Sequence, residues 1–376
     1  MKVLLTGGGT AGHINPALAI AELIRANAPG SEIAFVGIRG GKEEDLVPRE
    51  GYPLYYVRSK GIRRAHSPAA LLSNAYALWL AALSPYYPST RRILDDLVPD
   101  IVIGTGGYAC WPIMAAAARR GIPTALHESN ALPGLAVRRL QDRVDRIWTN
   151  FEKTASLLQV QDTVRQVGNP LRNAFATLGR QEAKERLGLT DRRLVLCFGG
   201  SLGAERVNLA ALEMMQRLAP KDEALVFCLA SGKRGYAETQ KRFCELGLSQ
   251  YPNCILTDYL YDMPVWMAAA ELAISRAGAM TLSELARTGT PAVLIPSPYV
   301  ADNHQYLNAR AVADAGGAAL LEESALSGEV LADTVASLMQ DPARLQAMSK
   351  SVAAMAGEDA GRRIWEDIVA LTGKRN

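Results

Sequence analysis

The chain has 376 residues, of which 49% are hydrophobic and 21% charged, an ordinary composition for a globular protein. A formal net charge of +3 is too small to indicate nucleic acid as the main partner, and the 32 Gly and 19 Pro follow no low-complexity period. At roughly 150 residues per domain, the length favours two domains.

Cysteine and histidine usage argues against a structural metal site. No C-x-x-C pair and no Cys/His cluster occurs, and the chain has only four histidines. The scattered cysteines indicate small buried apolar residues in a reducing compartment. The apolar start, residues 1–5, is too short for a signal peptide, so we expect a cytosolic protein. The five cysteines are Cys110, Cys197, Cys228, Cys244 and Cys254.

The first expected strand, residues 1–5, leads into a glycine-rich loop and then an Ala-rich helix. The loop reads Gly7-x-Gly9-x-x-Gly12 and ends at His13, which has the spacing of a dinucleotide-binding fingerprint. A histidine at a helix N-terminus tends to stay neutral, which suits a general base; a purely structural contact with the loop is the alternative.

The second expected strand, "EIAFVG", lacks the acidic residue that a dinucleotide site needs for the ribose hydroxyls. It runs into Ile38, Arg39 and Gly40, while Glu43 and Glu44 come too late, on the next expected helix. The sequence therefore argues against NAD or FAD in the first loop.

A strongly apolar segment, residues 68–88, follows and is bounded by prolines, which argues against a spanning helix. Apolar side chains with a basic rim suit a helix lying on an anionic membrane, and a core helix beside a solvated basic loop is the alternative. The apolar residues are Leu71, Leu72, Tyr76, Leu78, Trp79 and Leu80, and the basic ones are Lys60, Arg63, Arg64, Arg91 and Arg92.

Apolar strand patterns alternate with helical patterns along the rest of the chain, the rhythm of a parallel doubly wound sheet. The stretch "RLVLCFGGSLGAERVNLAALEMM" repeats the plan of the N-terminal stretch, so we expect an α/β protein with two Rossmann-like domains. We place the first at 1–165 and the second at 166–354, with a hinge within 161–173. A C-terminal helix, about 355–376, is expected to pack back on the first domain.

Three further glycine-containing turns, "GTGGYACWP", "FGGSLGAE" and "SRAGAMTLSE", each follow a strand and open a helix. Helix N-termini carry partial positive charge and bind anions without a metal. In the last turn, the spacing of Thr281 and Glu284 favours a capping box, with a ribose contact for Glu284 as the alternative. Farther on, Gln305 follows His304 and could bond sugar hydroxyls, whereas His127, at the end of a buried strand, could be structural.

Together, "GGTAGHINPALA", "GGYACWP", "HESNALPG", "GNPLR", "GGSLGA" and "SRAGAMTLSEL…PAVLIPSPYVADNHQYLNA" resemble the signatures of the MurG glycosyltransferase family. The resemblance implies a GT-B fold of two Rossmann-like domains facing a deep cleft. It implies transfer of GlcNAc from UDP-GlcNAc to the 4-hydroxyl of MurNAc in lipid I, with inversion, to form lipid II. It implies no metal and no cofactor, and contact with the cytoplasmic face of the membrane.

Site residues carry over from the matched motifs. The resemblance implies that His13 activates the acceptor hydroxyl and that Glu284 holds the ribose, which reverses the capping interpretation. Leu260 is expected to read uracil through its backbone, with Tyr259 beside it. The remaining donor-binding residues implied are Thr10, Ala11, Gly12, Asn130, Arg172, Ser201, Ala279, Met280, Thr281 and Gln305. Another GT-B nucleotide-sugar enzyme, an epimerase for instance, and a non-catalytic nucleotide-binding module are the alternatives.

Overall fold

The computed structural model describes residues 1–59, 77, 80, 83–200, 203–300, 303–356 and 360–373. The chain forms two compact units, Met1–Asn173 with Glu358–Asn376 as unit 1 and Ala174–Gly357 as unit 2. The first change of unit comes eight residues later than the expected 165/166 boundary. The reason is local: the backbone N–H of Asn173 donates to Glu22 at 3.0 Å, which holds the segment up to Asn173 on unit 1.

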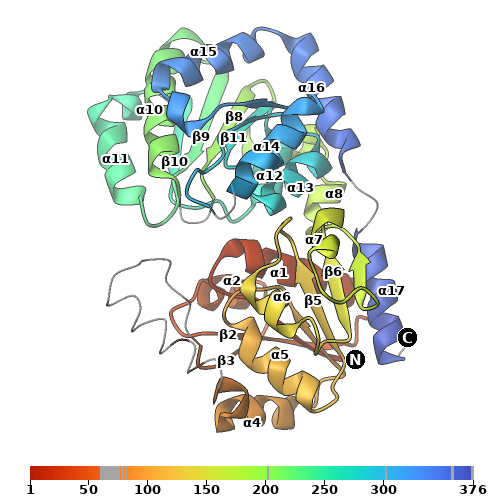
Figure 1. The fold of residues 1–376 in the computed structure, drawn as a ribbon. Coiled ribbons are helices and arrows are strands. Elements are labelled where there is room, and N and C mark those ends of the chain that lie inside the picture. Colours follow the sequence, from red (N-terminus) through yellow and green to blue (C-terminus); the bar gives the residue numbers. More distant parts are fainter. Residues whose placement is uncertain are drawn as a thin grey trace. The chain divides into compact units, whose positions relative to one another are not determined.

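Unit 1 contains a seven-stranded sheet in the order β3-β2-β1-β4-β5-β6-β7, with every neighbouring pair parallel (Figure 1). Its central strands β1, β4 and β5 are buried along nearly their whole length, as a parallel sheet covered on both faces requires. The strands are β1 (Lys2–Thr6), β2 (Glu32–Gly37), β3 (Leu54–Tyr56), β4 (Ile101–Gly104), β5 (Thr124–Glu128), β6 (Arg146–Thr149) and β7 (Val164–Gln166).

Two apolar layers cover this sheet. Ile14 and Ile20 of α1 and Ile364 and Ile368 of α17 pack on one face. Residues of α4, α5 and α6, Ile113 among them, pack on the other face. The helices of unit 1 are α1 (Ala11–Asn27), α2 (Glu43–Arg49), α4 (Pro88–Leu97), α5 (Cys110–Arg119), α6 (Leu135–Leu140), α7 (Glu152–Ser156) and α17 (Ala360–Thr372), with a 3₁₀ turn η1 (Ser84–Tyr86).

The C-terminal helix α17 belongs to unit 1 although nearly 200 residues separate it from the last strand of that sheet. Asp367 accepts a hydrogen bond from the indole N–H of Trp148 at 2.7 Å and pairs with Arg146 at 2.8 Å. These contacts attach α17 to β6, so the chain crosses to unit 2 and returns.

Unit 2 repeats the plan with a six-stranded parallel sheet in the order β10-β9-β8-β11-β12-β13 (Figure 1). Buried residues of α10 and α15 pack on one face, and α12 contacts β8 on the sheet as well. Its strands are β8 (Arg193–Phe198), β9 (Leu225–Ala230), β10 (Cys254–Thr257), β11 (Leu272–Ser275), β12 (Ala292–Leu294) and β13 (Ala318–Leu320). Its helices are α8 (Ala174–Thr177), α9 (Arg180–Leu187), α10 (Glu205–Leu218), α11 (Tyr236–Glu245), α12 (Met263–Ala269), α13 (Ala279–Thr288), α14 (His304–Asp314), α15 (Gly328–Met339) and α16 (Pro342–Ala354).

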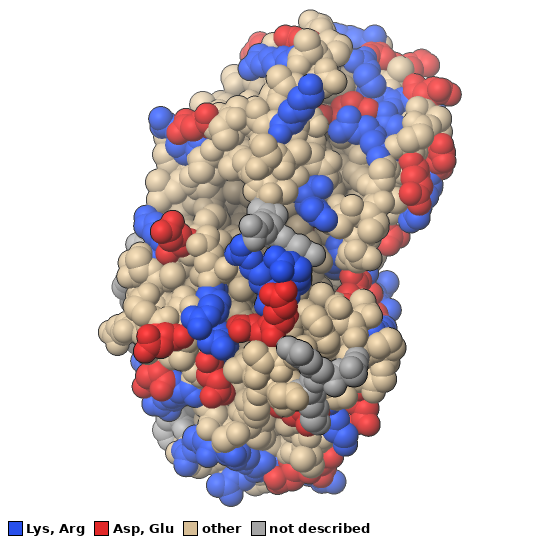
Figure 2. All heavy atoms as spheres, turned by 90° about the vertical axis from the view of Figure 1, so that its right-hand side faces the viewer, with Lys and Arg blue, Asp and Glu red and all other residues tan. Residues whose placement is uncertain are grey.

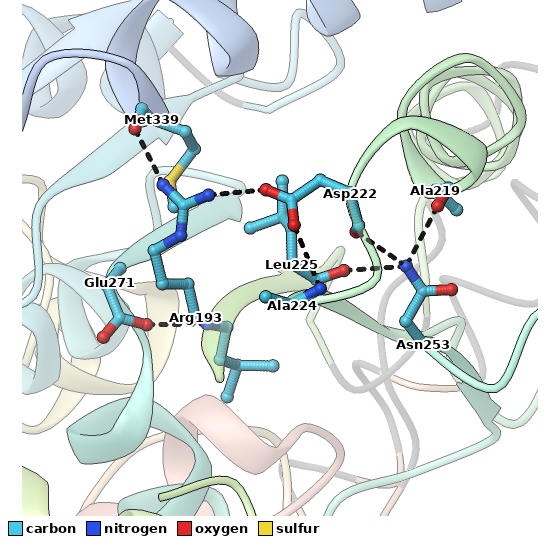
Figure 3. Close-up of polar contacts among 9 residues, drawn as sticks. Arg193, Ala219, Asp222, Ala224, Leu225, Asn253, Glu271 and Met339 are labelled. Atoms are coloured by element: carbon cyan, nitrogen blue, oxygen red, sulfur yellow. Dashed lines mark hydrogen bonds and ion pairs between the residues drawn. The ribbon is translucent and has the colours of Figure 1, made fainter. Parts of the chain in front are cut away.

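A polar network fixes the amino ends of the unit 2 strands (Figure 3). Arg193 donates to Asp222 at 2.6 Å and to the carbonyl of Met339 at 3.0 Å. The side-chain amide of Asn253 donates to three backbone carbonyls, and Glu271 accepts from the first amide after Arg193 at 2.6 Å. The network lies at the amino ends of the strands, whereas the glycine turns follow their carboxyl ends. We therefore assign the network a structural role.

The apolar segment 68–88 lies mostly outside the described residues, including Leu71, Leu72, Tyr76, Leu78 and Trp79. Leu80, however, is described and is only 6% exposed, so it belongs to the core. Within the described parts of the chain, no helix is both long enough and apolar enough to cross a bilayer. On the face drawn in Figure 2, basic and acidic side chains lie interspersed.

Candidate active site

Each sheet has a topological switch point where the strand order reverses, between β1 and β4 in unit 1 and between β8 and β11 in unit 2. Ligands of doubly wound folds bind at such points, outside the carboxyl ends of the strands. All four glycine turns singled out in the sequence follow these four strands. The fold therefore brings them together in pairs, one pair on each unit.

In unit 1 the β1–α1 and β4–α5 loops are hydrogen-bonded to each other and in close contact. The hydroxyl of Thr105 donates to the carbonyl of His13 at 2.6 Å, and its backbone N–H donates to the carbonyl of Thr6 at 2.9 Å. Gly106 and Gly107 have φ of 99° and 80°. A Cβ on Gly106 would stand 2.9 Å from the His13 ring, and one on Gly107 would overlap the carbonyl oxygen of Gly8. Only glycine permits this approach.

His13 is the third residue of α1, half-buried, with its ring held by the loop. Nδ1 lies 3.2 Å from the carbonyl oxygen of Gly8 and 3.3 Å from the hydroxyl of Thr10. A carbonyl oxygen can only accept, so Nδ1 carries the proton and Nε2 keeps its lone pair. The ring is thus arranged with a proton-accepting nitrogen.

Burial lowers the pKa of His13 below its usual 6.5, while the carboxylate of Glu128, the Gly8 carbonyl and the carboxylate of Glu43 raise it. Desolvation dominates, so the imidazole is neutral at pH 7. The N-terminus of α1 acts in the same direction, because its partial positive charge disfavours an imidazolium. A neutral imidazole with a free Nε2 is the form that a general base needs.

Asn130, in the loop after β5, is oriented by Glu128. One carboxylate oxygen of Glu128 accepts from the backbone N–H and the side-chain amide of Asn130, both at 3.0 Å. The other accepts from the backbone N–H of Gly134 at 2.7 Å. The preceding residue, His127, is fully buried, and burial lowers its pKa to about 4 while Nε2 donates to the carbonyl of Gly168 at 2.9 Å. His127 is therefore a neutral structural residue.

The first helical turn of α1 contains Ala11 and Gly12, and Thr10 is its N-cap residue. The amides of a first turn have no partners within the helix, so an anion can bind there. The φ of Ala11 is not positive, so the backbone there accommodates its methyl group.

Arg172 lies in unit 1, near its end at Asn173. Its guanidinium pairs with Glu22 at 3.1 Å and with Glu50 at 3.0 Å. Glu22 also accepts the backbone N–H of Asn173, so this cluster holds the end of unit 1 against α1. The expected contact of Arg172 with the nucleotide stays a prediction.

In unit 2, Ala279, Met280 and Thr281 form the first turn of α13, whose N-cap is Gly278. Thr281 is therefore inside the helix, and the capping box expected from its spacing is wrong. Glu284 is 7% exposed, and among the described residues its carboxyl makes no hydrogen bond. Burial raises the pKa of Glu284 to about 8. Burying a carboxyl group without hydrogen-bond donors costs free energy. Glu284 does not cap α13, so its position indicates a role in binding a ligand.

Gln305, at the start of α14, is held over the end of β12. Its side-chain oxygen accepts the backbone N–H of Ser297 at 2.9 Å, which leaves its amide hydrogens as donors. Asn308 on the same helix donates to the carbonyl of Ala277 at 3.2 Å. The Asn308 bond ties α14 to the β11–α13 loop, and the Gln305 bond ties it to the segment after β12. Ser201, the remaining candidate of this unit, lies outside the described residues.

Leu260 follows β10 and is buried, between two aromatic neighbours. The rings of Tyr259 and Tyr261 lie 4.8 Å apart, edge to face, and the ammonium of Lys233 lies over both rings at 5.7 and 5.5 Å. The sequence did not point to Lys233. This residue follows β9, and its contact with the two tyrosines after β10 can be foreseen only once β9 and β10 are known to be neighbours.

Comparisons with known proteins identify the family. Residues 3–149 match the model of the glycosyltransferase family 28 N-terminal domain, and residues 194–364 match that of its C-terminal domain. A curated relative from Acetivibrio thermocellus, named UDP-N-acetylglucosamine--N-acetylmuramyl-(pentapeptide) pyrophosphoryl-undecaprenol N-acetylglucosamine transferase, is 38% identical over 98% of this chain and 97% of its own. A relative of the same name from Desulforamulus reducens is 40% identical over 93% of each chain. The chain belongs to the MurG family.

Solved structures agree. The crystal structure of MurG from Acinetobacter baumannii matches with a TM-score of 0.68 at 26% identity, over 98% of this chain and 99% of that one. The UDP-GlcNAc 2-epimerase of Neisseria meningitidis matches with a TM-score of 0.63 at 19% identity, over 98% of this chain and 100% of that one, which shows a shared fold alone. The expected α/β class with two Rossmann-like domains of GT-B type is confirmed, and the chain is an N-acetylglucosaminyltransferase.

Proposed function

We propose that this protein transfers GlcNAc from UDP-GlcNAc to the 4-hydroxyl of MurNAc in lipid I, and so forms lipid II for peptidoglycan synthesis. The observation that carries the proposal is the full-length similarity, at 35–40% identity, to curated relatives that share one transferase name. The structural likeness to epimerases is below 20% identity and so gives no support to epimerisation.

We assign donor binding mainly to unit 2. Leu260 would read the uracil, and the first turn of α13, with Ala279, Met280 and Thr281, would hold the diphosphate. Such a helix N-terminus stabilises the negative charge of the departing UDP without a metal. Glu284 would accept hydrogen bonds from the two ribose hydroxyls, the donors that its buried carboxyl lacks among the described residues.

Contacts to the transferred sugar complete the donor site. Gln305 would donate to the GlcNAc hydroxyls, and Asn130 would present its side-chain oxygen, since Glu128 already binds its amide. Thr10, Ala11 and Gly12 would face the sugar or the diphosphate. Arg172 and Ser201 are carried over from the family as further nucleotide or phosphate contacts.

The chemical step assigned to unit 1 is proton removal by His13. As the 4-hydroxyl oxygen of MurNAc attacks the anomeric carbon, the bond from that carbon to the diphosphate oxygen breaks. The hydroxyl proton passes to Nε2, and UDP leaves with the bonding electrons. One displacement inverts the anomeric centre. Among the described residues no group of three His, Cys, Asp or Glu could hold a metal ion, and we propose a metal-independent reaction.

The decisive assay measures UDP release with UDP-GlcNAc, a lipid I analogue and EDTA. Lipid II formation together with acceptor-dependent UDP release, unchanged by EDTA, is the expected result. UDP release or C2 epimerisation without acceptor would instead favour an epimerase, and binding of UDP-GlcNAc without any turnover would favour a binding module. Loss of activity in EDTA would contradict metal independence.

Because the acceptor is a lipid, we further propose peripheral binding of unit 1 to an anionic membrane on its cytoplasmic face. In the described part of this region, Leu83 and Tyr86 are 38% and 46% exposed. The Arg119 guanidinium stacks 4.2 Å from the Tyr86 ring centre, and Arg91 and Arg92 on α4 are exposed. Asp95 and Asp96 of α4 pair with Arg120 and Arg92, so the proposal rests on the exposed apolar side chains together with Arg91 and Arg119.

Liposome sedimentation tests this contact. Because Leu80 is buried, replacing it would damage the core, so Leu83→Ser with Tyr86→Ser is the informative variant. We expect weaker binding to anionic vesicles and unchanged turnover of a water-soluble acceptor analogue. Wild-type vesicle binding by the double variant would overturn the assignment of this surface.

A further inference from the structure

One peptide group joins His13 to a buried carboxylate on another element. The carbonyl of Gly8 accepts the Nδ1 proton of His13 at 3.2 Å. The N–H of the same peptide group, that of Gly9, donates to Glu43 at 3.2 Å. The N–H and C=O of a trans peptide point in opposite directions, so the carboxylate and the imidazole lie on opposite sides of it.

Glu43 begins α2 and is 1% exposed, although it is an acidic residue. Its second carboxylate oxygen accepts the backbone N–H of Ile38 at 3.0 Å, just after β2. Both oxygens therefore accept hydrogen bonds from amides, as an ionised carboxylate does. The buried charge is held between the end of β2 and the first glycine loop.

Glycines make room for this carboxylate. A Cβ on Gly8 would stand 2.6 Å from one oxygen of Glu43, and Cβ atoms on Gly37 and Gly41 would overlap its side chain. Three glycines, from the β1–α1 loop, the end of β2 and the β2–α2 loop, therefore surround one acidic side chain. A carboxylate that only capped the start of α2 could remain on the surface and would need no surrounding glycines. The burial of Glu43 therefore indicates that its main contact is with the first glycine loop.

A carboxylate bonded to an amide N–H polarises the peptide and strengthens the carbonyl at its other end as an acceptor. Here that carbonyl binds the Nδ1 proton of His13. A stronger acceptor fixes the tautomer that leaves Nε2 free, and it stabilises the imidazolium that forms when Nε2 takes a proton. In serine proteases an aspartate does this by direct contact with the histidine.

We propose that Glu43 is a positioning residue for His13 and acts on it through the Gly8–Gly9 peptide. The proposal rests on the role proposed above for His13 as the base. In the transfer step the acceptor proton moves to Nε2 alone. The Nδ1 proton stays bonded to the Gly8 carbonyl, and Glu43 gains no proton.

Other titratable groups face His13 and must be distinguished from Glu43. Glu128, at the end of β5, raises the pKa of His13 more strongly than Glu43 does. Tyr108, from the β4–α5 loop, lies against Gly9, and both burial and Glu43 raise the pKa of its phenol. Any test therefore needs a variant that removes the Glu43 charge and leaves these two groups in place.

The first experiment is NMR of the histidine side chains in the full-length protein without substrate, so its outcome does not depend on the proposed reaction. We expect ¹⁵N shifts of the Nδ1–H tautomer for His13. Glu43→Gln removes a charge that raises the pKa of His13, so the titration of His13 should move to lower pH. Glu44→Gln is the matched control, because exposed Glu44 is the next residue of the same helix and, among the described residues, accepts a hydrogen bond from the Gly40 N–H at 2.9 Å.

The second experiment is steady-state kinetics of the same variants. Loss of a group that orients a functional side chain through hydrogen bonds lowers turnover by about ten- to a hundredfold. We expect kcat of Glu43→Gln to fall by this factor, while its KM for UDP-GlcNAc should change by less than about twofold. The acid limb of kcat/KM should move to lower pH in Glu43→Gln. Glu43→Asp, which keeps the charge, should lie between Glu43→Gln and the wild type, and Glu44→Gln should match the wild type.

An Nε2–H tautomer in the wild-type protein would overturn the proposal, as would an unchanged His13 titration in folded Glu43→Gln. If Glu44→Gln shifted the His13 titration as much as Glu43→Gln does, the effect would be one of overall charge rather than of the Gly8–Gly9 peptide. That result would also overturn the proposal. If Glu43→Gln does not fold, two measurements replace it: the tautomer of His13 in the wild type and the His13 titration in Glu43→Asp. An Nε2–H tautomer, or an unchanged titration in Glu43→Asp, would then overturn the proposal. Failure of lipid II synthesis by the wild type would overturn the proposed function and leave the NMR result standing.

Discussion

At the scale of single residues, the site depends on protonation states that burial sets. His13 is kept neutral with its proton on Nδ1, whereas Glu284 is a carboxyl without donors among the described residues. Burial shifts both groups away from their charged forms, since a low dielectric penalises charge. The two residues therefore respond to pH in ways that can be measured separately.

Replacing His13 by Ala should lower kcat by about a hundred- to ten-thousandfold, the usual contribution of a general base. KM for UDP-GlcNAc should stay near the wild-type value, since the donor contacts are assigned mainly to unit 2. Because the pKa of His13 is lowered, the part of the kcat/KM profile that His13 controls should fall only below pH 6.5, whereas the titration of Glu284 affects donor binding at higher pH. Wild-type turnover by a folded His13→Ala variant would exclude this residue as the base.

Glu284→Gln should stabilise the free protein and weaken donor binding. A folded-state pKa of about 8, above the unfolded value of 4.5, means that the folded protein holds a proton which the unfolded chain releases between these values. The free energy of unfolding therefore falls as pH rises from 4.5 to 8, and the variant lacks that loss. Thermal melts at pH 5 and pH 8 measure the difference, which should grow with pH. A variant no more stable at pH 8, with wild-type UDP affinity, would contradict both expectations.

At the scale of elements, glycine loops determine how closely the helices and strands of the site approach each other. The β1–α1 and β4–α5 loops touch through backbone atoms, so a single methyl group must push them apart. The C-terminal helix is attached differently, since one partly buried carboxylate, that of Asp367, joins it to a strand of unit 1.

Gly107→Ala should destabilise unit 1 and lower activity. Its φ of 80° costs an alanine about 1–2 kcal/mol, and overlap with the Gly8 carbonyl adds roughly 1–3 kcal/mol. Gly121→Ala is the control: its φ is 68° and no atom lies within 4 Å of an added Cβ, so only the first term applies. Urea unfolding followed by tryptophan fluorescence compares the two, and equal losses would mean that the loop contact is unimportant.

Asp367→Ala should destabilise unit 1 by about 3 kcal/mol, because it leaves the indole N–H of Trp148 and the guanidinium of Arg146 without their partner. The side chains of Arg146 and Asp367 are each only 16% exposed. Glu366→Ala removes an adjacent carboxylate that is 60% exposed and should change stability by less than about 0.5 kcal/mol. Denaturant midpoints of both variants provide the measurement, and equal midpoints would refute a special role for Asp367.

At the scale of the whole molecule, two units with separate cores and separate sheets share one chain, and each presents a switch point lined by glycine turns. The proposed reaction assigns them different tasks, since unit 2 would hold the nucleotide and unit 1 would supply the base. Ligands that occupy only part of the site should therefore act on the units unequally.

Hydrogen exchange with UDP alone tests this division. We expect added protection over residues 259–262 and 277–285 of unit 2, because a bound ligand stabilises the segments that it contacts. The loop 7–13 of unit 1 should gain little until a sugar-bearing donor is added. Equal protection of both units by UDP would contradict the assignment of the nucleotide to unit 2.

The sequence by itself determined the fold class, because strand periodicity, buried apolar runs and glycine turns are local signals. It also selected the four turns that the two switch points bring together, since each follows a strand end directly. The missing acid after β2 argued against a dinucleotide site, and the motif set identified the family.

Only the tertiary structure decided how particular side chains are used. Glu43 looked too late in the chain to matter, yet it reaches back 34 residues to bond Gly9. Thr281 looked like a cap, yet α13 begins two residues earlier; Leu80 looked like a membrane contact, yet it is buried. In each case the deciding contact joins segments distant in the chain or depends on where a helix begins, and neither spacing nor composition encodes these long-range distances.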